Sequence, residues 1–93
     1  MLNNEEREKI EAATFRRLVS HLQKNTSLQN IDLMNLAGFC RNCLARWYEE
    51  AASKNNVKMS KEESRELFYG MPFKEWKAKY QTQDTMQIAH PKD

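Results

Sequence analysis

Apolar side chains recur at helical spacing through the first 24 residues of the sequence. Placed about 100° apart around a helix, the larger ones share one stripe: Phe15, Leu18, Val19 and Leu22. Asn3 or Asn4 is a suitable N-cap, and glutamates follow directly, where the helix macrodipole favours negative charge. We therefore predict a first helix that begins near Asn3 and runs to about Lys24.

The segment from Asn30 to Lys54 carries the longest apolar pattern in the chain. One band about 100° wide contains most of its apolar residues: Leu33, Leu36, Ala37, Cys40, Leu44, Trp47 and Ala51. Gly38 is the single internal weakness, because glycine is a poor helix former. The pattern predicts one continuous second helix, and the short turn at residues 25–27 predicts that it runs antiparallel to the first.

Capping and turn residues divide the remaining chain into two shorter segments. Ser60 with Glu63 predicts a capping box, Gly70 a helix end and Pro72 the start of another helix. We therefore expect an all-α fold, a small bundle of two longer antiparallel helices plus two short C-terminal helices. The short helices are expected to pack four side chains across the long pair: Leu67, Phe68, Phe73 and Trp76. Residues 1–81 would form the single domain, and the polar residues 82–93 a flexible tail.

Composition narrows the functional classes. A chain of 93 residues with two glycines, two valines and three isoleucines lacks the residues from which a nucleotide-binding α/β fold is built. Its formal net charge is +2 and both signs are interspersed, which does not favour nucleic-acid binding. No apolar run approaches the roughly 20 residues of a membrane span, and the N-terminus has no signal-peptide pattern. We expect a cytoplasmic protein that binds no membrane and keeps its cysteines reduced.

Cys40 and Cys43 form a C-x-x-C motif with three interpretations. As members of an apolar stripe they are two small core residues, the interpretation we favour. A redox pair would need Cys40 at a helix N-terminus, which only a break at Gly38 would provide. A zinc site would need further ligands, and the chain offers only His21, about two turns away along the hairpin, and His90 in the tail. We therefore assign no metal ligand and no cofactor, with the two cysteines as the candidates for either chemistry.

Other residues give weaker chemical signals. No nucleophile or carboxylate is placed near His21 by spacing, so we identify no catalytic residue and do not expect an enzyme. The segment Phe73–Tyr80 interleaves aromatic residues with lysines, a combination that also suits binding to single-stranded nucleic acid. Its aromatic residues recur at helical spacing and the overall charge is balanced, so we interpret the segment as a docked helix with lysines outside.

The leading functional hypothesis is a surface for a protein partner. Met34 and Phe39 lie off the main stripe of the second helix, and large apolar groups outside a small core usually mark a contact surface. Gly38 would allow another helix to approach closely, beside a polar row that includes Asn42 and Arg46. We predict that these five residues are the interaction surface of a non-enzymatic protein-protein interaction module. We expect it to assemble as a homo-oligomer, a dimer, or to bind another protein.

Two motifs resemble a known family. The segments NIDLMNLAGFCRNCL (Asn30–Leu44) and YGMPFKEWK (Tyr69–Lys77) resemble a family of short bacterial proteins known as domain of unknown function 1244. The resemblance covers about Arg16 to Tyr80 and implies a small, all-helical bacterial protein. It implies no activity, so no catalytic residue is carried over, and the alternative of a metal-binding or thiol-redox protein that uses the C-x-x-C pair stays open.

Overall fold

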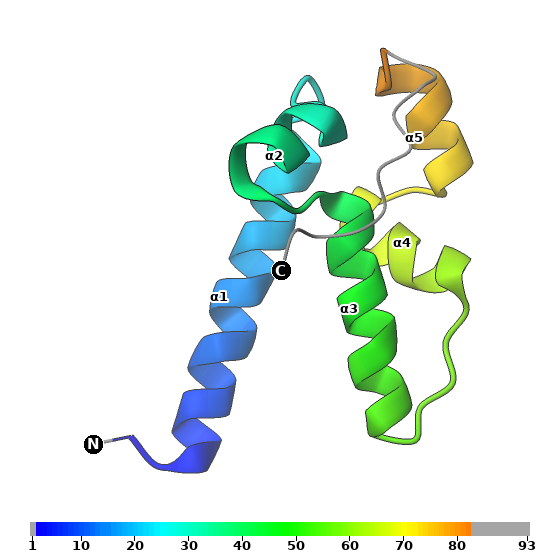
Figure 1. Cartoon of the computed structure of the whole chain (residues 1–93). Coiled ribbons are helices and arrows are strands. Elements are labelled where there is room, and N and C mark those ends of the chain that lie inside the picture. Colours follow the sequence, from blue (N-terminus) through cyan, green and yellow to red (C-terminus); the bar gives the residue numbers. More distant parts are fainter. Residues whose placement is uncertain (1, 83–93) are drawn as a thin grey trace.

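The computed structural model describes residues 2–82, which form five α-helices and no strand (Figure 1). The helices are α1 (Asn4–Lys24), α2 (Asn30–Ala37), α3 (Arg41–Lys54), α4 (Lys61–Tyr69) and α5 (Phe73–Tyr80). The predicted all-α class is confirmed. Of the predicted tail, residues 82–93, all but residue 82 lie outside the described residues. Among residues 2–82, no helix has both the length and the apolar character that crossing a membrane requires.

Two helices begin at capping boxes. Asn3 Oδ1 accepts a hydrogen bond from the backbone N–H of Glu6 at 2.8 Å, and the Glu6 carboxylate accepts one from the backbone N–H of Asn3 at 3.0 Å. Ser60 and Glu63 make the same pair of contacts at the start of α4, as predicted. These contacts hold the pKa of Glu63 below its usual value. The caps satisfy backbone donors that would otherwise lack partners, so they determine where each helix starts.

The predicted single helix from Asn30 to Lys54 is wrong. Gly38 adopts a left-handed conformation (φ 79°, ψ 12°) and its N–H bonds to the carbonyl oxygen of Met34 at 2.9 Å, which ends α2. The chain resumes helical geometry only at Arg41, with Cys40 in an extended conformation as the N-cap. Glycine adopts this left-handed conformation at no steric cost, and periodicity alone does not detect such a one-residue break. The break changes which faces are buried on either side of it.

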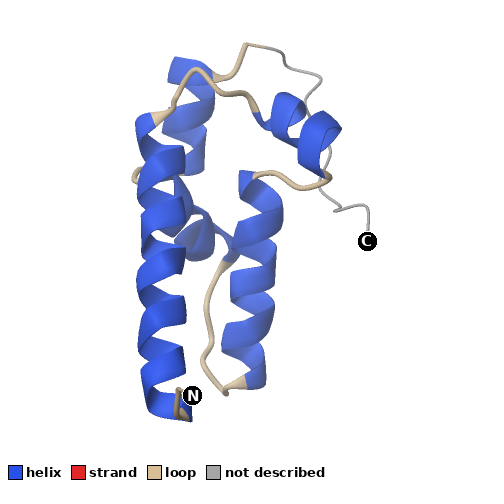
Figure 2. Cartoon of the chain, turned by 90° about the vertical axis from the view of Figure 1, so that its left-hand side faces the viewer, coloured by secondary structure: helices blue, strands red, loops and turns tan. Residues whose placement is uncertain are grey.

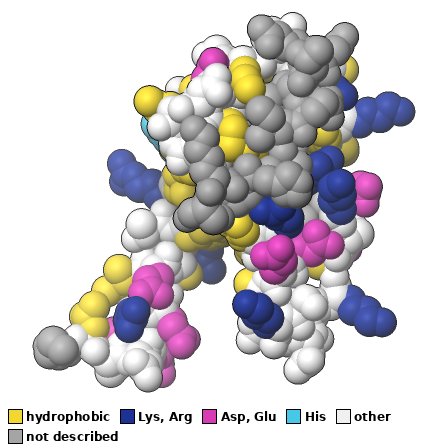
Figure 3. Space-filling model, viewed as in Figure 1, with side chains coloured by type: hydrophobic (Ala, Val, Ile, Leu, Met, Phe, Trp, Pro, Cys, Tyr) yellow, Lys and Arg dark blue, Asp and Glu magenta, His cyan; other side chains and the backbone are white. Residues whose placement is uncertain are grey.

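The two longest helices, α1 and α3, run in opposite directions, and the N-terminus of α1 lies at the same end of the molecule as the C-terminus of α3 (Figures 1 and 2). The most extensive helix packing among the described residues is between α3 and α4, while α1 contacts α4 less extensively. Figure 3 shows open space between the first half of α1 and the end of α3. The long pair is therefore splayed at this end.

Aromatic side chains join the helices. Phe15 of α1 packs on Tyr48 of α3 and Phe68 of α4, with ring centroids 6.0 and 5.6 Å away. Tyr69 and Trp76 make a second contact, with centroids 4.8 Å apart, that holds α5 against the end of α4. Phe68 and Trp76 are buried and Phe73 is half-buried. Leu67 was expected in the same core but is 47% exposed.

Candidate functional site

The junction of α2 and α3, residues 38–43, which we call the elbow, contains the C-x-x-C motif. Cys40 and Cys43 are both 0% exposed, and their Sγ atoms lie 3.5 Å apart. Burial raises the pKa of the Cys40 thiol to about 11, although the backbone N–H groups of Cys43 and Asn42 act in the opposite direction. The Cys40 thiol is therefore protonated at neutral pH.

The elbow bears on all three interpretations of the motif. The cysteines are core residues, as favoured, and pack with Met34 in one buried cluster. The break at Gly38 also places Cys40 at the N-terminus of α3, the position that a redox pair requires. Among residues 2–82, no group of three or more His, Cys, Asp or Glu side chains is close enough together to hold a metal ion. His90 lies outside the described residues.

Arg41, at the start of α3, is completely buried and was not predicted. One terminal nitrogen, Nη1, donates to the carbonyl oxygen of Leu28 at 2.7 Å and to Asn30 Oδ1 at 3.1 Å. The other, Nη2, donates to the carbonyl oxygens of Leu22 at 3.2 Å and Asn25 at 2.9 Å. A single guanidinium thus connects the end of α1, the following turn and the start of α2 to the first residue of α3.

The charge of Arg41 is offset by dipoles. Its four oxygen acceptors include carbonyls at the C-terminal end of α1, where the helix macrodipole is negative. The guanidinium carbon also lies 4.9 Å from the ring centroid of Trp76, in a cation-π contact. Burial lowers the pKa of Arg41, but an arginine stays protonated in proteins. Among the described residues, Nε of Arg41 has no hydrogen-bond acceptor.

A chain of hydrogen bonds continues from Arg41 across the elbow. Asn30 accepts from Arg41 and donates through Nδ2 to the hydroxyl of Tyr69 at 2.9 Å. Tyr69 in turn donates to Asn42 Oδ1 at 2.8 Å. Burial raises the pKa of Tyr69 well above its usual value. The hydroxyl therefore stays protonated and links α2, α3 and the end of α4.

The five residues predicted as an interaction surface do not lie on one exposed face. Met34 is only 3% exposed, so its expected exposure is wrong, because the chain turns at Gly38 and buries the other side of α2. Phe39 is half-buried against the same cluster. Asn42 and Arg46 line a cavity of about 210 Å³ between α3 and α4. Their role in binding a partner stays a prediction.

A larger groove lies between α1, α3 and α4. Its volume is about 420 Å³, and its lining is mainly apolar. The lining residues come from all three helices: Ala12, Phe15, Arg16, Val19, Ser20, Gln23, Tyr48, Leu67 and Phe68. The only sign of the groove in the sequence was the apolar stripe that contains Phe15 and Val19. The sequence did not indicate which elements would face that stripe, so the groove was missed.

Comparison with known proteins gives a family without an assigned activity. The family model described as protein of unknown function (DUF1244) matches residues 28–90. The matched segment contains the elbow and α2 to α5 and begins after α1. No curated protein matches the chain.

Proposed function

We propose that this chain, which belongs to the DUF1244 family of proteins of unknown function, is a non-enzymatic protein-protein interaction module that acts as a homodimer. The observation that carries the proposal is the apolar groove between α1, α3 and α4. In the proposed dimer, α1 of a second copy covers this groove. An amphipathic helix in an apolar groove is a recurrent form of protein recognition.

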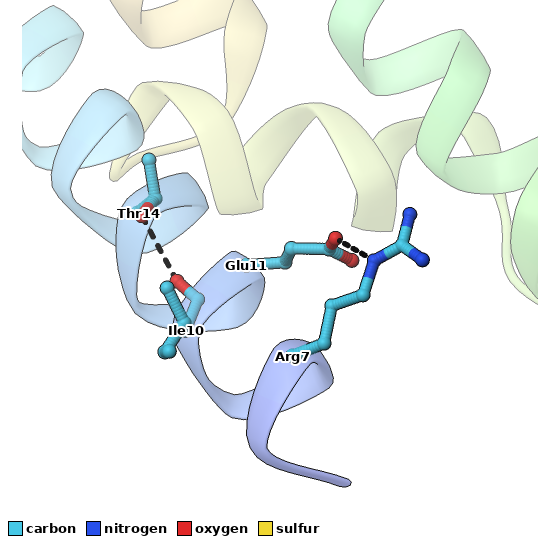
Figure 4. A network of polar contacts seen from close by, with 4 residues as sticks. All are labelled: Arg7, Ile10, Glu11 and Thr14. Carbon is cyan, nitrogen blue, oxygen red and sulfur yellow. Dashed lines mark hydrogen bonds and ion pairs between the residues drawn. The ribbon is translucent and has the colours of Figure 1, made fainter. Parts of the chain in front are cut away.

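The first half of α1 supports the proposal because little else among residues 2–82 packs on it. Residues 4–11 are all exposed, and Leu22 near the other end is the only fully buried residue of the helix. The contacts in this half are made within the helix. Arg7 forms an ion pair with Glu11 at 2.8 Å, and Thr14 Oγ1 donates to the carbonyl oxygen of Ile10 at 2.9 Å. Figure 4 shows both interactions.

The charges of α1 favour a second copy in antiparallel orientation. Residues 4–11 contain four glutamates, one arginine and one lysine, a net charge of −2. Residues 12–24 contain Arg16, Arg17 and Lys24 and no acidic residue, a net charge of +3. Two antiparallel copies would place the acidic half of each helix beside the basic half of the other. Such complementarity specifies the partner and its orientation.

One face of α1 gives this pairing a defined centre. Glu8, Ala12 and Arg16 are four residues apart, so they stay within a band about 80° wide on the helix. Ala12 and Arg16 line the groove, and Glu8 continues the same face by one turn. A two-fold axis at Ala12 would place Glu8 of each copy beside Arg16 of the other. The small side chain of Ala12 would allow the two helices to approach closely.

The alternative function, a metal-binding or thiol-redox protein, is less well supported. The thiols of Cys40 and Cys43 are buried, so the folded chain presents neither sulfur to a metal ion or substrate. Tyr48 and Leu67 of the groove, by contrast, are exposed in this single copy and would lose water on dimerisation. Removal of that apolar surface from water would stabilise the dimer.

The experiment compares two adjacent alanines of α1. Ala12→Glu places a charge in the groove, whereas Ala13→Glu places the same charge on the exposed face. Light scattering over a concentration series should give a dimer for the unmodified chain and Ala13→Glu, and a monomer for Ala12→Glu. Circular dichroism should show the same helix content in all three. A monomeric unmodified chain at high concentration, or equal masses for both variants, would refute the proposal.

A further inference from the structure

The pair of adjacent thiols in the elbow plays no part in the proposed dimer. Cys40 precedes the first residue of α3, and Cys43 is in the first turn. Their Sγ atoms are 3.5 Å apart, about 1.5 Å more than the length of a disulfide bond. A small change in side-chain rotation and backbone would bring the two sulfurs into bonding distance.

The start of α3 also provides backbone N–H groups that can stabilise a thiolate. The backbone N–H groups of Cys43 and Asn42 act to lower the pKa of the Cys40 thiol, as they do at other helix N-termini that carry reactive cysteines. Burial is the larger effect and raises that pKa to about 11. Exposure of the sulfur to water would remove the burial effect and leave the helix N–H groups to stabilise the thiolate.

Two partly buried side chains, Leu33 and Phe39, pack against the cluster that contains the pair. The ring centroid of Phe39 is 6.2 Å from that of Trp47. Phe39 is only half-buried, and it lies between Gly38, which ends α2 in a left-handed conformation, and Cys40, which is extended. Segments with little buried apolar area open locally more readily than the core does.

We propose that Cys40 and Cys43 are a protected dithiol, which closes to an intramolecular disulfide when the Gly38–Phe39 segment opens and admits a small-molecule disulfide. The Cys40 thiol loses its proton to solvent, and the thiolate attacks one sulfur of the small disulfide. This forms a mixed disulfide and releases one small thiolate. Cys43 then loses its proton and attacks Cys40 Sγ, which forms the Cys40–Cys43 bond and releases the second thiolate. The pair gives up two electrons, and the small disulfide is reduced to two thiols.

The order of attack follows from position. Cys40 has the helix N–H groups that stabilise a thiolate, so it reacts with the oxidant, and Cys43 resolves the mixed disulfide. The chain with Cys43→Ala should therefore stop at the mixed disulfide on Cys40. The chain with Cys40→Ala should react more slowly than the chain with Cys43→Ala.

The experiment incubates the full chain with oxidised glutathione and follows its mass. The expected product has lost two hydrogen atoms and carries no glutathione, and Cys43→Ala should retain one glutathione. Phe39→Ala should accelerate closure by roughly tenfold because it removes a side chain that packs on the cluster. Ile10→Ala, on the exposed half of α1 and outside the groove, should leave the rate unchanged.

Global unfolding is the competing route to the same product. Low concentrations of urea distinguish the two, because a local opening exposes little surface and its rate depends weakly on urea. A closure rate that is nearly independent of urea, and fastest in Phe39→Ala, would support the protected dithiol. A rate that rises with urea as unfolding does, or no disulfide in the folded chain, would overturn it.

Discussion

The elbow and the groove differ in which kind of side chain is buried. In and around the elbow, polar groups lie inside the protein: Arg41 hydrogen-bonds to Asn30 and to neighbouring backbone carbonyls, and Asn30 hydrogen-bonds to Tyr69. In the groove, apolar groups such as Tyr48 and Leu67 remain partly exposed. A buried polar group costs free energy unless it is hydrogen-bonded inside the protein, whereas half-exposed apolar groups gain from a partner outside. The elbow is therefore an internal structural element and the groove an external one.

This contrast predicts where substitutions act. Substitutions in the elbow should lower the free energy of unfolding, and they should do so even when the chain is monomeric. Changes on the groove face of α1 should alter the mass in solution and leave the fold intact.

Arg41→Met should produce the largest loss. The substitution removes four hydrogen bonds from the guanidinium to buried or partly buried oxygen atoms, at a cost of about 3–5 kcal/mol in the free energy of unfolding. Arg46→Met, on the same helix but partly exposed, should stay within about 0.5 kcal/mol. Urea denaturation of the two variants measures the difference. If Arg41→Met and Arg46→Met were equally stable, the carbonyl contacts of Arg41 would contribute nothing net.

Tyr69→Phe should have the next largest effect. It removes the hydroxyl that connects Asn30 to Asn42, so the buried amide of Asn30 loses its acceptor, at about 1–3 kcal/mol. Tyr48→Phe removes a hydroxyl from a partly exposed ring and should cost less than about 0.5 kcal/mol. Thermal unfolding of both variants provides the comparison, and equal melting temperatures would contradict the role given to the Tyr69 hydroxyl.

The stability of the elbow should depend on alkaline pH. The pKa of Cys40 is raised to about 11 in the folded chain, so the folded state holds this proton more tightly than the unfolded state does. The resulting stabilisation is complete below the unfolded pKa of about 8.5 and is lost as pH rises toward 11. Urea midpoints for Cys40→Ala should therefore fall less steeply between pH 8.5 and 10 than those of the unmodified chain. Parallel pH profiles would contradict this assignment.

Ile10→Ala should have the smallest effect. Ile10 lies in the first half of α1, is 51% exposed and faces away from the groove. The change removes little buried surface and replaces a β-branched residue by a better helix former. The free energy of unfolding should therefore change by less than about 0.5 kcal/mol. Amide hydrogen exchange measures the stability of this half of α1 directly. In the Ala12→Glu chain, which we expect to be monomeric, residues 4–11 should be weakly protected from exchange. High protection there would show that α1 is stabilised by contacts within its own chain.

Local signals explain how much of the fold could be predicted. Asn3, Ser60 and Gly70 act through backbone atoms within a few residues, so their sequence pattern was enough to place the corresponding helix ends. Gly38 was noted as a weakness, but a glycine inside an apolar pattern is compatible with either a continuous helix or a break. The choice depends on contacts such as those of Arg41, whose acceptors are more than ten residues away.

The break explains the errors at the candidate site. Leu36 was placed on the core stripe and is 88% exposed, while Met34 was placed outside it and is buried. The sequence did predict that both cysteines are buried, because each lies near the apolar stripe of α3 itself. The groove involves α1, α3 and α4, which are distant in sequence, and helical periodicity does not determine how such elements face one another.

The central claim, that α1 of a second copy covers the groove, is tested most directly by mixing two charge-reversal variants. Glu8→Arg and Arg16→Glu should each place two like-charged pairs across the dimer and weaken it about tenfold or more. Within one helix, residues 8 and 16 are about 12 Å apart along the axis, too far for a direct ion pair. An equimolar mixture restores both pairs between chains, so light scattering should show a dimer in the mixture and monomers in each variant alone. A mixture that stays monomeric while the unmodified chain is a dimer, or single variants that remain dimers, would contradict the account.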